Sequence, residues 1–226
     1  MSIAHRVGLM VPINNTTMEK ELLAWLPAGS HCDTRKIPRG QGLLTRETIP
    51  AYKAQALEIA KQFVGQPIEL LAYGCTAASF LSGPQEDAEL CDQLSNTLGK
   101  PVVTTARAMV LALQAKGAQR IALVTPYLDE VNQQLQRYLA QSDIEVAAFD
   151  TLRAADVHAL GQITSAQVAA MARQVMREDC DALFIACSQL PTHDILLSLS
   201  QSFGRPVLSS IQATAWRACQ LLDKEH

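Results

Sequence analysis

The chain has little charge and few aromatic residues. Of its 226 residues, 18% are charged and 5% are aromatic, and the formal net charge is −3. No run of lysine and arginine forms a basic stripe, which argues against nucleic acid as a partner. Hydrophobic residues, 48% of the chain, suffice for a sizeable core in one large domain or in two lobes of about 100 residues each.

Long apolar runs are absent as well. No segment reaches the ~18 apolar residues of a membrane-spanning helix. The first residues, MSIAHRVGLMVP, lack the apolar stretch of a secretory signal peptide. These absences predict a cytoplasmic protein without a membrane partner.

The usual motifs for metals, nucleotides and redox cofactors are also missing. The sequence has no CxxC, no HExxH and no tight cluster of histidine and cysteine, so no metal site is expected. Neither a P-loop nor a dinucleotide-binding glycine fingerprint is present, and we expect no cofactor. Disulfides are disfavoured in a reducing compartment. The six cysteines are residues 32, 75, 91, 180, 187 and 219.

Short apolar runs alternate with longer amphipathic stretches, which is the pattern of an α/β protein with a parallel sheet covered on both faces. The segment 31–48 is polar and contains proline and glycine, and we expect a long loop there, over the sheet edge or the site. The expected strands are 6–11, 68–73, 101–104, 120–124, 145–149, 182–186 and 206–209. The expected helices are about 17–26, 48–64, 77–97, 105–116, 127–141, 164–178, 191–202 and 211–223.

The chain also repeats itself. The strand, proline and helix of 7–26 recur at 121–139, and LGKPVVTTARAMVLAL (98–113) is matched by FGRPVLSSIQATAWRA (203–218). A repeat of this kind predicts two pseudo-symmetric lobes, each with a parallel, flavodoxin-like sheet flanked by helices.

We place one lobe at residues 1–106, with a C-terminal helix at 211–226 packing back on it, and the other lobe at 107–210. Ligands of open parallel sheets bind outside the carboxyl ends of the strands. The cleft between the two lobes is therefore the expected active site.

Two corresponding strands end in cysteine, in GCT at Cys75 and in ACSQ at Cys187. A thiolate at the start of a helix has a lowered pKa and is prepared to act as a nucleophile or a base. A single cysteine in such a place is more often a small buried hydrophobe. Two cysteines at matching positions of a repeat instead favour a pair of catalytic thiols facing one ligand.

Small polar residues follow the strands at the same edge: Asn14, Asn15, Thr76, Ser188 and Gln189. They offer amides and hydroxyls to a carboxylate, but serine, threonine and asparagine are also the preferred N-caps of helices. One residue can serve both purposes, so both interpretations stay open.

Three other polar side chains near these segments are ambiguous. The phenol of Tyr127 can donate to a substrate oxygen, or its ring can simply pack. His193 follows Cys187 but is better explained as an outward-facing residue of a helix. Arg39 and Arg46, in the polar loop, can reach an anionic substrate, although most loop arginines are only solvated.

Taken together, the motifs resemble the aspartate/glutamate racemase superfamily, in its branch of maleate cis-trans isomerase and arylmalonate decarboxylase. The matching segments span nearly the whole chain in the family's order. They read VPINNTTMEKE, AYGCTAASF, PVVTTARA, ALVTPYLDEVN, DALFIACSQL and GRPVLSSIQATAW.

The resemblance implies two pseudo-symmetric lobes and cofactor-independent chemistry in the cleft between them. Cys75 and Cys187 match the two family cysteines, and Asn15 and Tyr127 match the asparagine and tyrosine of the family's loops. Thr76 and Ser188, with Asn14 and Gln189 beside the matched positions, are the expected carboxylate ligands.

The family contains several reactions, and both cysteines matter for the choice among them. Arylmalonate decarboxylases have glycine at the first position, so a chain with both thiols is expected to be an isomerase or a racemase. The resemblance implies an asparagine in isomerase-like relatives within the segment that reads RAADVHALGQI (153–163) here, and this chain has none there. The second cysteine is followed by serine where threonine is common, which keeps the hydroxyl.

The leading hypothesis is a cofactor-independent isomerase of a small dicarboxylate, converting maleate to fumarate. The alternatives are an amino-acid (aspartate or glutamate) or hydantoin racemase with the same two thiols, a decarboxylase with Cys187 as proton donor, and a non-catalytic binding protein for small acids. The expected partner is a small carboxylate substrate, and the family suggests a homodimer or higher homo-oligomer.

Overall fold

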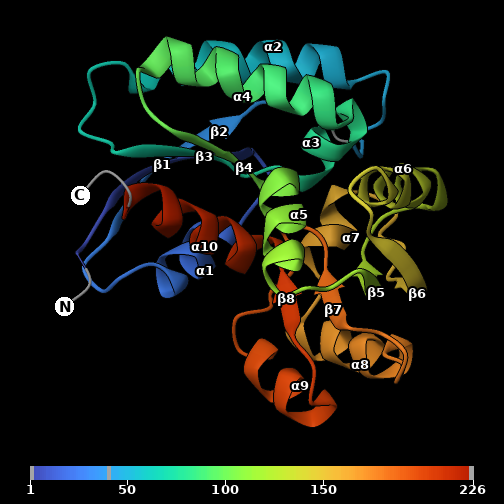
Figure 1. The fold of residues 1–226 in the computed structure, drawn as a ribbon. Coiled ribbons are helices and arrows are strands. Elements are labelled where there is room, and N and C mark those ends of the chain that lie inside the picture. Colours follow the sequence, from blue (N-terminus) through green and yellow to red (C-terminus); the bar gives the residue numbers. More distant parts are fainter. Residues whose placement is uncertain (1–2, 40–41, 224–226) are drawn as a thin grey trace.

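The computed structural model describes residues 3–39 and 42–223. Within them the chain forms two four-stranded parallel sheets, each in the middle of its own lobe (Figure 1). The first sheet has the strand order β2-β1-β3-β4, and the second has the order β6-β5-β7-β8. The same order in both halves confirms the predicted α/β fold of two pseudo-symmetric lobes.

All neighbouring strands pair in parallel, and the β5–β6 pair has one shift of register between Ile121 and Ala122. The central strands β3 and β7 are buried at every residue, whereas the outermost strands β2 and β6 are partly exposed. The strands are β1 (Arg6–Pro12), β2 (His31–Ile37), β3 (Leu70–Tyr73), β4 (Val102–Thr104), β5 (Arg120–Thr125), β6 (Glu145–Thr151), β7 (Ala182–Ile185) and β8 (Val207–Ser209).

Helices cover the first sheet on both faces, with α2 and α4 on one side and α1 and α10 on the other (Figure 1). Helix α10 packs on α1 and α5, which brings the end of the described chain back onto the first lobe. The helices are α1 (Met18–Trp25), α2 (Ile49–Ala60), the 3-10 turn η1 (Lys61–Phe63), α3 (Thr76–Ser82), α4 (Pro84–Leu98), α5 (Thr105–Ala115), α6 (Asp129–Ala140), α7 (Val157–Gly161), α8 (Ser165–Val175), α9 (Leu196–Phe203) and α10 (Ser210–Leu222).

The proposed lobe bounds of 1–106 and 107–210 stay a prediction, and residues 224–226 of the predicted C-terminal helix lie outside the described residues. No helix in the described part of the chain is long and apolar enough to cross a membrane.

The prediction of a long loop at 31–48 is wrong for the first half of that segment. Residues His31–Ile37 form β2, which pairs with β1 at the edge of the first sheet. Of this strand only Ile37 is fully buried, so its sequence lacks the apolar run of an inner strand. After Ile37, the residues Arg39, Leu43 and Leu44 line the site described below, as expected of this segment.

Two helix predictions also need correction. The stretch predicted as one helix at 77–97 is two, α3 and α4, because Gly83 has a positive φ of 87° and Pro84 starts the second helix. The helix predicted at 191–202 begins only at Leu196. The short helix α7 was not expected at all.

Gly74 sets the path of the chain between β3 and Cys75. A Cβ atom at this position would lie 2.4 Å from Sδ of Met18 and 2.8 Å from Cγ1 of Val11. The Gly74 amide donates to the carbonyl of Met10 at 2.7 Å. Only glycine fits there without displacing its neighbours, and the close approach places Cys75 directly beyond the sheet edge.

Candidate active site

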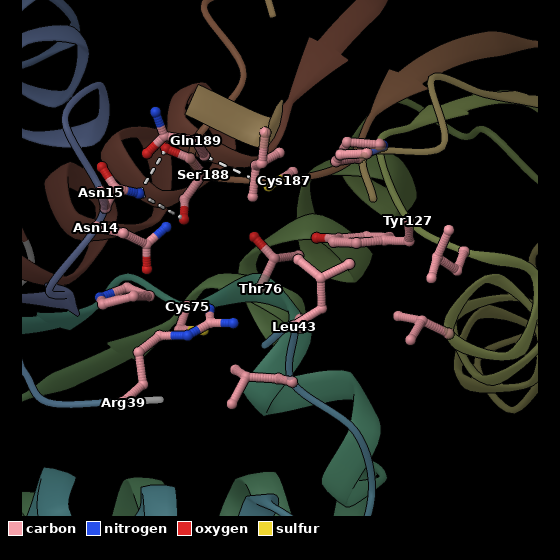
Figure 2. Close-up of a pocket in the computed structure, with 18 residues that line it drawn as sticks. Asn14, Asn15, Arg39, Leu43, Cys75, Thr76, Tyr127, Cys187, Ser188 and Gln189 are labelled. Carbon is pink, nitrogen blue, oxygen red and sulfur yellow. Dashed lines mark hydrogen bonds between the residues drawn. The ribbon is translucent and has the colours of Figure 1, made fainter. Parts of the chain in front are cut away.

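A cavity lies where the carboxyl ends of the two sheets face each other (Figure 2). All eight predicted site residues line it. They come from the ends of four strands, which are β1, β3, β5 and β7. The structure therefore brings the predicted site together, although the role of each residue in binding or catalysis stays a prediction.

Cys75 stands at the start of α3 in an extended conformation, with φ −126° and ψ 93°. Its side chain is buried, and burial raises the pKa of the thiol. The backbone N–H groups of Ala77 and Ala78, the positive charge of Arg39 and the hydroxyl of Tyr52 act in the opposite direction. The expected help from the helix start is present, but burial outweighs it.

Cys187 is held differently. Its φ is +143°, a backbone conformation that side chains rarely adopt. A turn follows it instead of a helix, so the expectation of a helix N-terminus at this thiol is wrong. Burial raises the pKa of Cys187 to about 11, against the effect of the Gln189 amide and the Tyr127 hydroxyl, which lower it. The backbone N–H of Gln189 donates a hydrogen bond to Sγ of Cys187, with an N–S distance of 3.4 Å.

Three of the predicted substrate-binding residues join the lobes (Figure 2). Asn15 Nδ2 donates to the Ser188 carbonyl at 3.0 Å, and its Oδ1 accepts from the amide of Met18 at 2.9 Å. The Ser188 hydroxyl donates to the Gly74 carbonyl at 2.8 Å. The Gln189 amide bonds to Thr16, accepting at Oε1 and donating at Nε2, both at 3.0 Å. Asn15 thus satisfies an amide at the start of α1, and all three side chains connect the Cys187 turn to the other lobe.

Each of the other three predicted binding residues has a polar side-chain atom without a hydrogen-bond partner in the part of the chain that the structure describes. Among the described residues, Asn14 Oδ1, the Thr76 hydroxyl and the Tyr127 hydroxyl are buried and have no hydrogen-bond partner. Figure 2 shows the Tyr127 hydroxyl directed toward Thr76, near Cys187. The ring of Tyr127 packs edge-on against Phe80 at 5.5 Å. The ring of Tyr127 therefore packs, and donation from its hydroxyl to a substrate oxygen stays a prediction.

The far wall of the cavity is apolar. The segment 153–163 contributes Ala154 and Leu160 to this wall. The wall is completed by residues from two other elements and the loop after β2, namely Leu43, Leu44, Pro126, Leu128 and Val131.

Two side chains that sequence reasoning did not assign to the site lie at Cys75. Arg39 follows β2 and lines the cavity, whereas Arg46 of the same loop is exposed and does not. Tyr52 of α2 is buried behind Cys75, and its hydroxyl lowers the pKa of that thiol. Arg39 was marked by its polar loop, but no pattern in the sequence pointed to Tyr52.

The remaining candidates lie elsewhere. His193 is exposed and packs edge-on against Trp25, with ring centroids 4.9 Å apart, outside the cavity. All six cysteines are free thiols. No group of three or more His, Cys, Asp or Glu side chains able to hold a metal ion occurs in the described part of the chain.

Comparison with known proteins gives a consistent picture. The maleate isomerase of Nocardia farcinica (strain IFM 10152) is 30% identical over 226 residues, which cover 96% of this chain and 90% of that protein. Arylmalonate decarboxylase of Bordetella bronchiseptica is 27% identical over 184 residues, covering 80% of this chain and 77% of the relative.

A solved structure matches as well. It is a serine-for-cysteine mutant of Nocardia farcinica maleate cis-trans isomerase with a covalently bound succinylcysteine intermediate. The match has a TM-score of 0.90 and 28% sequence identity, and it covers 98% of this chain and 94% of that one. A family model described as arylmalonate decarboxylase matches residues 7–226. The resemblance seen in the motifs is thus confirmed, and the chain belongs to the arylmalonate decarboxylase family.

Proposed function

We propose that this protein is a cofactor-independent isomerase that converts maleate to fumarate with two cysteines. The observation that carries the proposal is the pair of buried thiols, Cys75 and Cys187, which line one cavity from opposite lobes. A relative with 30% identity is a maleate isomerase, and a structure of such an enzyme holds a succinylcysteine. Succinylcysteine is the product expected when a thiolate adds to the double bond of maleate.

In this mechanism Cys75 is the nucleophile. Its thiolate forms a C–S bond at C2 of maleate, and the π electron pair moves to C3, where the thiol of Cys187 supplies a proton. The C2–C3 bond is now single and rotates. The Cys187 thiolate takes the proton back, the electron pair re-forms the double bond in the trans geometry, and the C–S bond breaks. Both thiols return to their starting states, so no co-reactant is needed.

The two cysteines suit these roles because their surroundings differ. Arg39 and the amides at the start of α3 favour the thiolate of Cys75. Cys187 has a pKa of about 11 and stays protonated near neutral pH. The buried hydroxyls of Thr76 and Tyr127, which have no partner among the described residues, and Nδ2 of Asn14 are the proposed donors to the substrate carboxylate, where negative charge develops during addition.

Proton NMR in D2O tests the proposal. The purified protein is incubated separately with maleate, aspartate, glutamate, a hydantoin and an arylmalonate. Conversion of maleate to fumarate is the expected result. Deuterium entering an α-position of an amino acid or hydantoin without net conversion identifies a racemase instead, and loss of CO2 from the arylmalonate identifies a decarboxylase.

Further properties expected from the sequence remain proposals. They are a cytoplasmic location, a homodimer or higher homo-oligomer, and the lobe bounds of 1–106 and 107–210. Light scattering of the purified protein measures the oligomeric state directly, and a monomeric mass would contradict the proposed homo-oligomer.

A further inference from the structure

The substrate of the proposed reaction has two carboxylates, but the cavity has a polar end and an apolar wall. Asn14, Thr76 and Tyr127 serve the polar end. The segment 153–163 contributes only Ala154 and Leu160 to the opposite wall, so it supplies no amide for a second carboxylate. A buried carboxylate without a partner is costly, so a second ligand must come from another part of the cavity.

Arg39 is the only positively charged side chain among the described residues that line the cavity. Figure 2 shows its guanidinium group directed toward Cys75 and the interior of the site. A guanidinium nitrogen, Nη2, donates to the carbonyl of Gly42, which holds the side chain within its own loop. Its Nε is buried and has no hydrogen-bond partner in the described part of the chain.

These features make Arg39 suitable for an anion. Guanidinium groups stay charged and bind carboxylates through a planar set of N–H donors. None of the salt bridges among the described residues involves Arg39, so no carboxylate in residues 3–39 and 42–223 forms an ion pair with it. The loop also places Leu43 and Leu44 on the cavity wall.

We propose that Arg39 binds the second carboxylate of the substrate, for which the segment 153–163 supplies no polar side chain to the cavity. The inference rests on the proposed function, because it assumes a dicarboxylate substrate. It makes Arg39 the residue that selects dicarboxylates over monocarboxylates. The second carboxylate then lies on the Cys75 side of the cavity, close to the carbon that this thiolate attacks.

Kinetics with maleate provide the first test. Arg39→Gln removes the charge, Arg39→Lys keeps a charge without the planar donors, and Arg46→Gln is the matched control from the same loop. Loss of a charge-assisted hydrogen bond is expected to raise KM for maleate about 10- to 100-fold in Arg39→Gln. The Arg39→Lys variant should recover part of that loss, and Arg46→Gln should match the unmodified protein. An unchanged KM in Arg39→Gln would overturn the proposal.

A binding measurement separates this inference from the proposed function. Iodoacetamide alkylates Cys75, peptide mass spectrometry follows the rate, and succinate or butyrate is added as a protecting ligand that is not turned over. The half-protecting concentration of succinate should rise about 10- to 100-fold in Arg39→Gln, with little change for butyrate.

The two failures look different. If the unmodified protein converts maleate but succinate protects Arg39→Gln equally well, the role of Arg39 is wrong and the proposed function stands. If succinate protects Cys75 in an Arg39-dependent way but maleate is not converted, the proposed reaction is wrong and the dicarboxylate site stands.

Discussion

The ends of β3 and β7 occupy equivalent places in the two lobes, yet they hold their cysteines in different ways. Cys75 has an ordinary extended backbone and leads into a helix, with Arg39 beside it. Cys187 has a φ of +143° and leads into a turn, and its amide donates to the Ser210 hydroxyl at 3.0 Å.

The turn after Cys187 also forms several side-chain hydrogen bonds with the first lobe. Asn15 bonds to Ser188, Thr16 bonds to Gln189, and the buried carboxylate of Glu21 accepts from the amide and hydroxyl of Thr192 at 2.7 and 2.9 Å. The repeat of the chain thus preserves the position of the thiol but not its surroundings. Unequal surroundings are what a reaction needs when one thiol must attack and the other must carry a proton.

Removal of either thiol is the strongest way to break this comparison. Cys75→Ala and Cys187→Ala should each lower kcat for maleate by about 100- to 10,000-fold. The first variant lacks the nucleophile and the second lacks the proton carrier, and water is a poor substitute for either. Conversion of maleate to fumarate, followed by NMR, measures the effect. Cys91→Ala is the matched control, since Cys91 is a free thiol outside the cavity and should keep full activity. Near-normal turnover in either cavity variant would contradict the two-thiol mechanism.

Substitution of Gly74 tests how the first thiol is positioned. The Cβ atom in Gly74→Ala would press on the Met18 and Val11 side chains, so the free energy of unfolding should fall by about 1–3 kcal/mol. Gly161→Ala is the control, because nothing lies within 4 Å of a Cβ at that position. Urea denaturation compares the two variants, and an equal loss in both would contradict the tight packing at the end of β3.

The pH dependence of kcat/KM sharpens the assignment of roles. Burial raises the pKa of Cys75, so only a small fraction is thiolate near neutral pH, and kcat/KM should rise with pH by up to about tenfold per pH unit. The rise should end, and reverse, as Cys187 loses its proton around its pKa of about 11. Initial rates with maleate from about pH 7 upward measure the profile. A flat profile between about pH 7 and pH 9 would mean that Cys75 is already ionised, against the effect of its burial.

The strained backbone of Cys187 predicts a smaller effect on stability. Glycine tolerates a positive φ, so Cys187→Gly should be more stable than Cys187→Ala by about 1 kcal/mol. At Cys75, where φ is −126°, the glycine variant should gain nothing over the alanine variant. Thermal unfolding of the four variants measures both differences. The same difference at both positions would show that backbone strain does not distinguish the two cysteines.

The sequence was enough to predict most of the fold, because the inner strands of both sheets are buried on both faces and show as apolar runs. It did not predict β2, whose exposed edge position leaves only Ile37 buried. The boundary between α3 and α4 was marked by Gly83 and Pro84, and the predicted single helix overlooked that signal.

The repeat likewise placed the predicted site residues around one cavity, since equivalent strand ends meet there. It did not show how the side chains divide between tasks. Asn15 and Gln189 use their amides to join the lobes, which depends on contacts between residues far apart in the chain. The direction of Arg39 depends on the path of its loop, and the burial of both thiols depends on the packing of the whole cavity.

The most direct test of the unequal roles is to trap the covalent intermediate. Cys187→Ser is incubated with maleate, digested, and mapped by peptide mass spectrometry, with Cys75→Ser treated in parallel. The account predicts a succinyl group on Cys75 in the first variant and none on Cys187 in the second. A succinyl group on Cys187, or an adduct on both thiols alike, would contradict the assignment of Cys75 as the nucleophile.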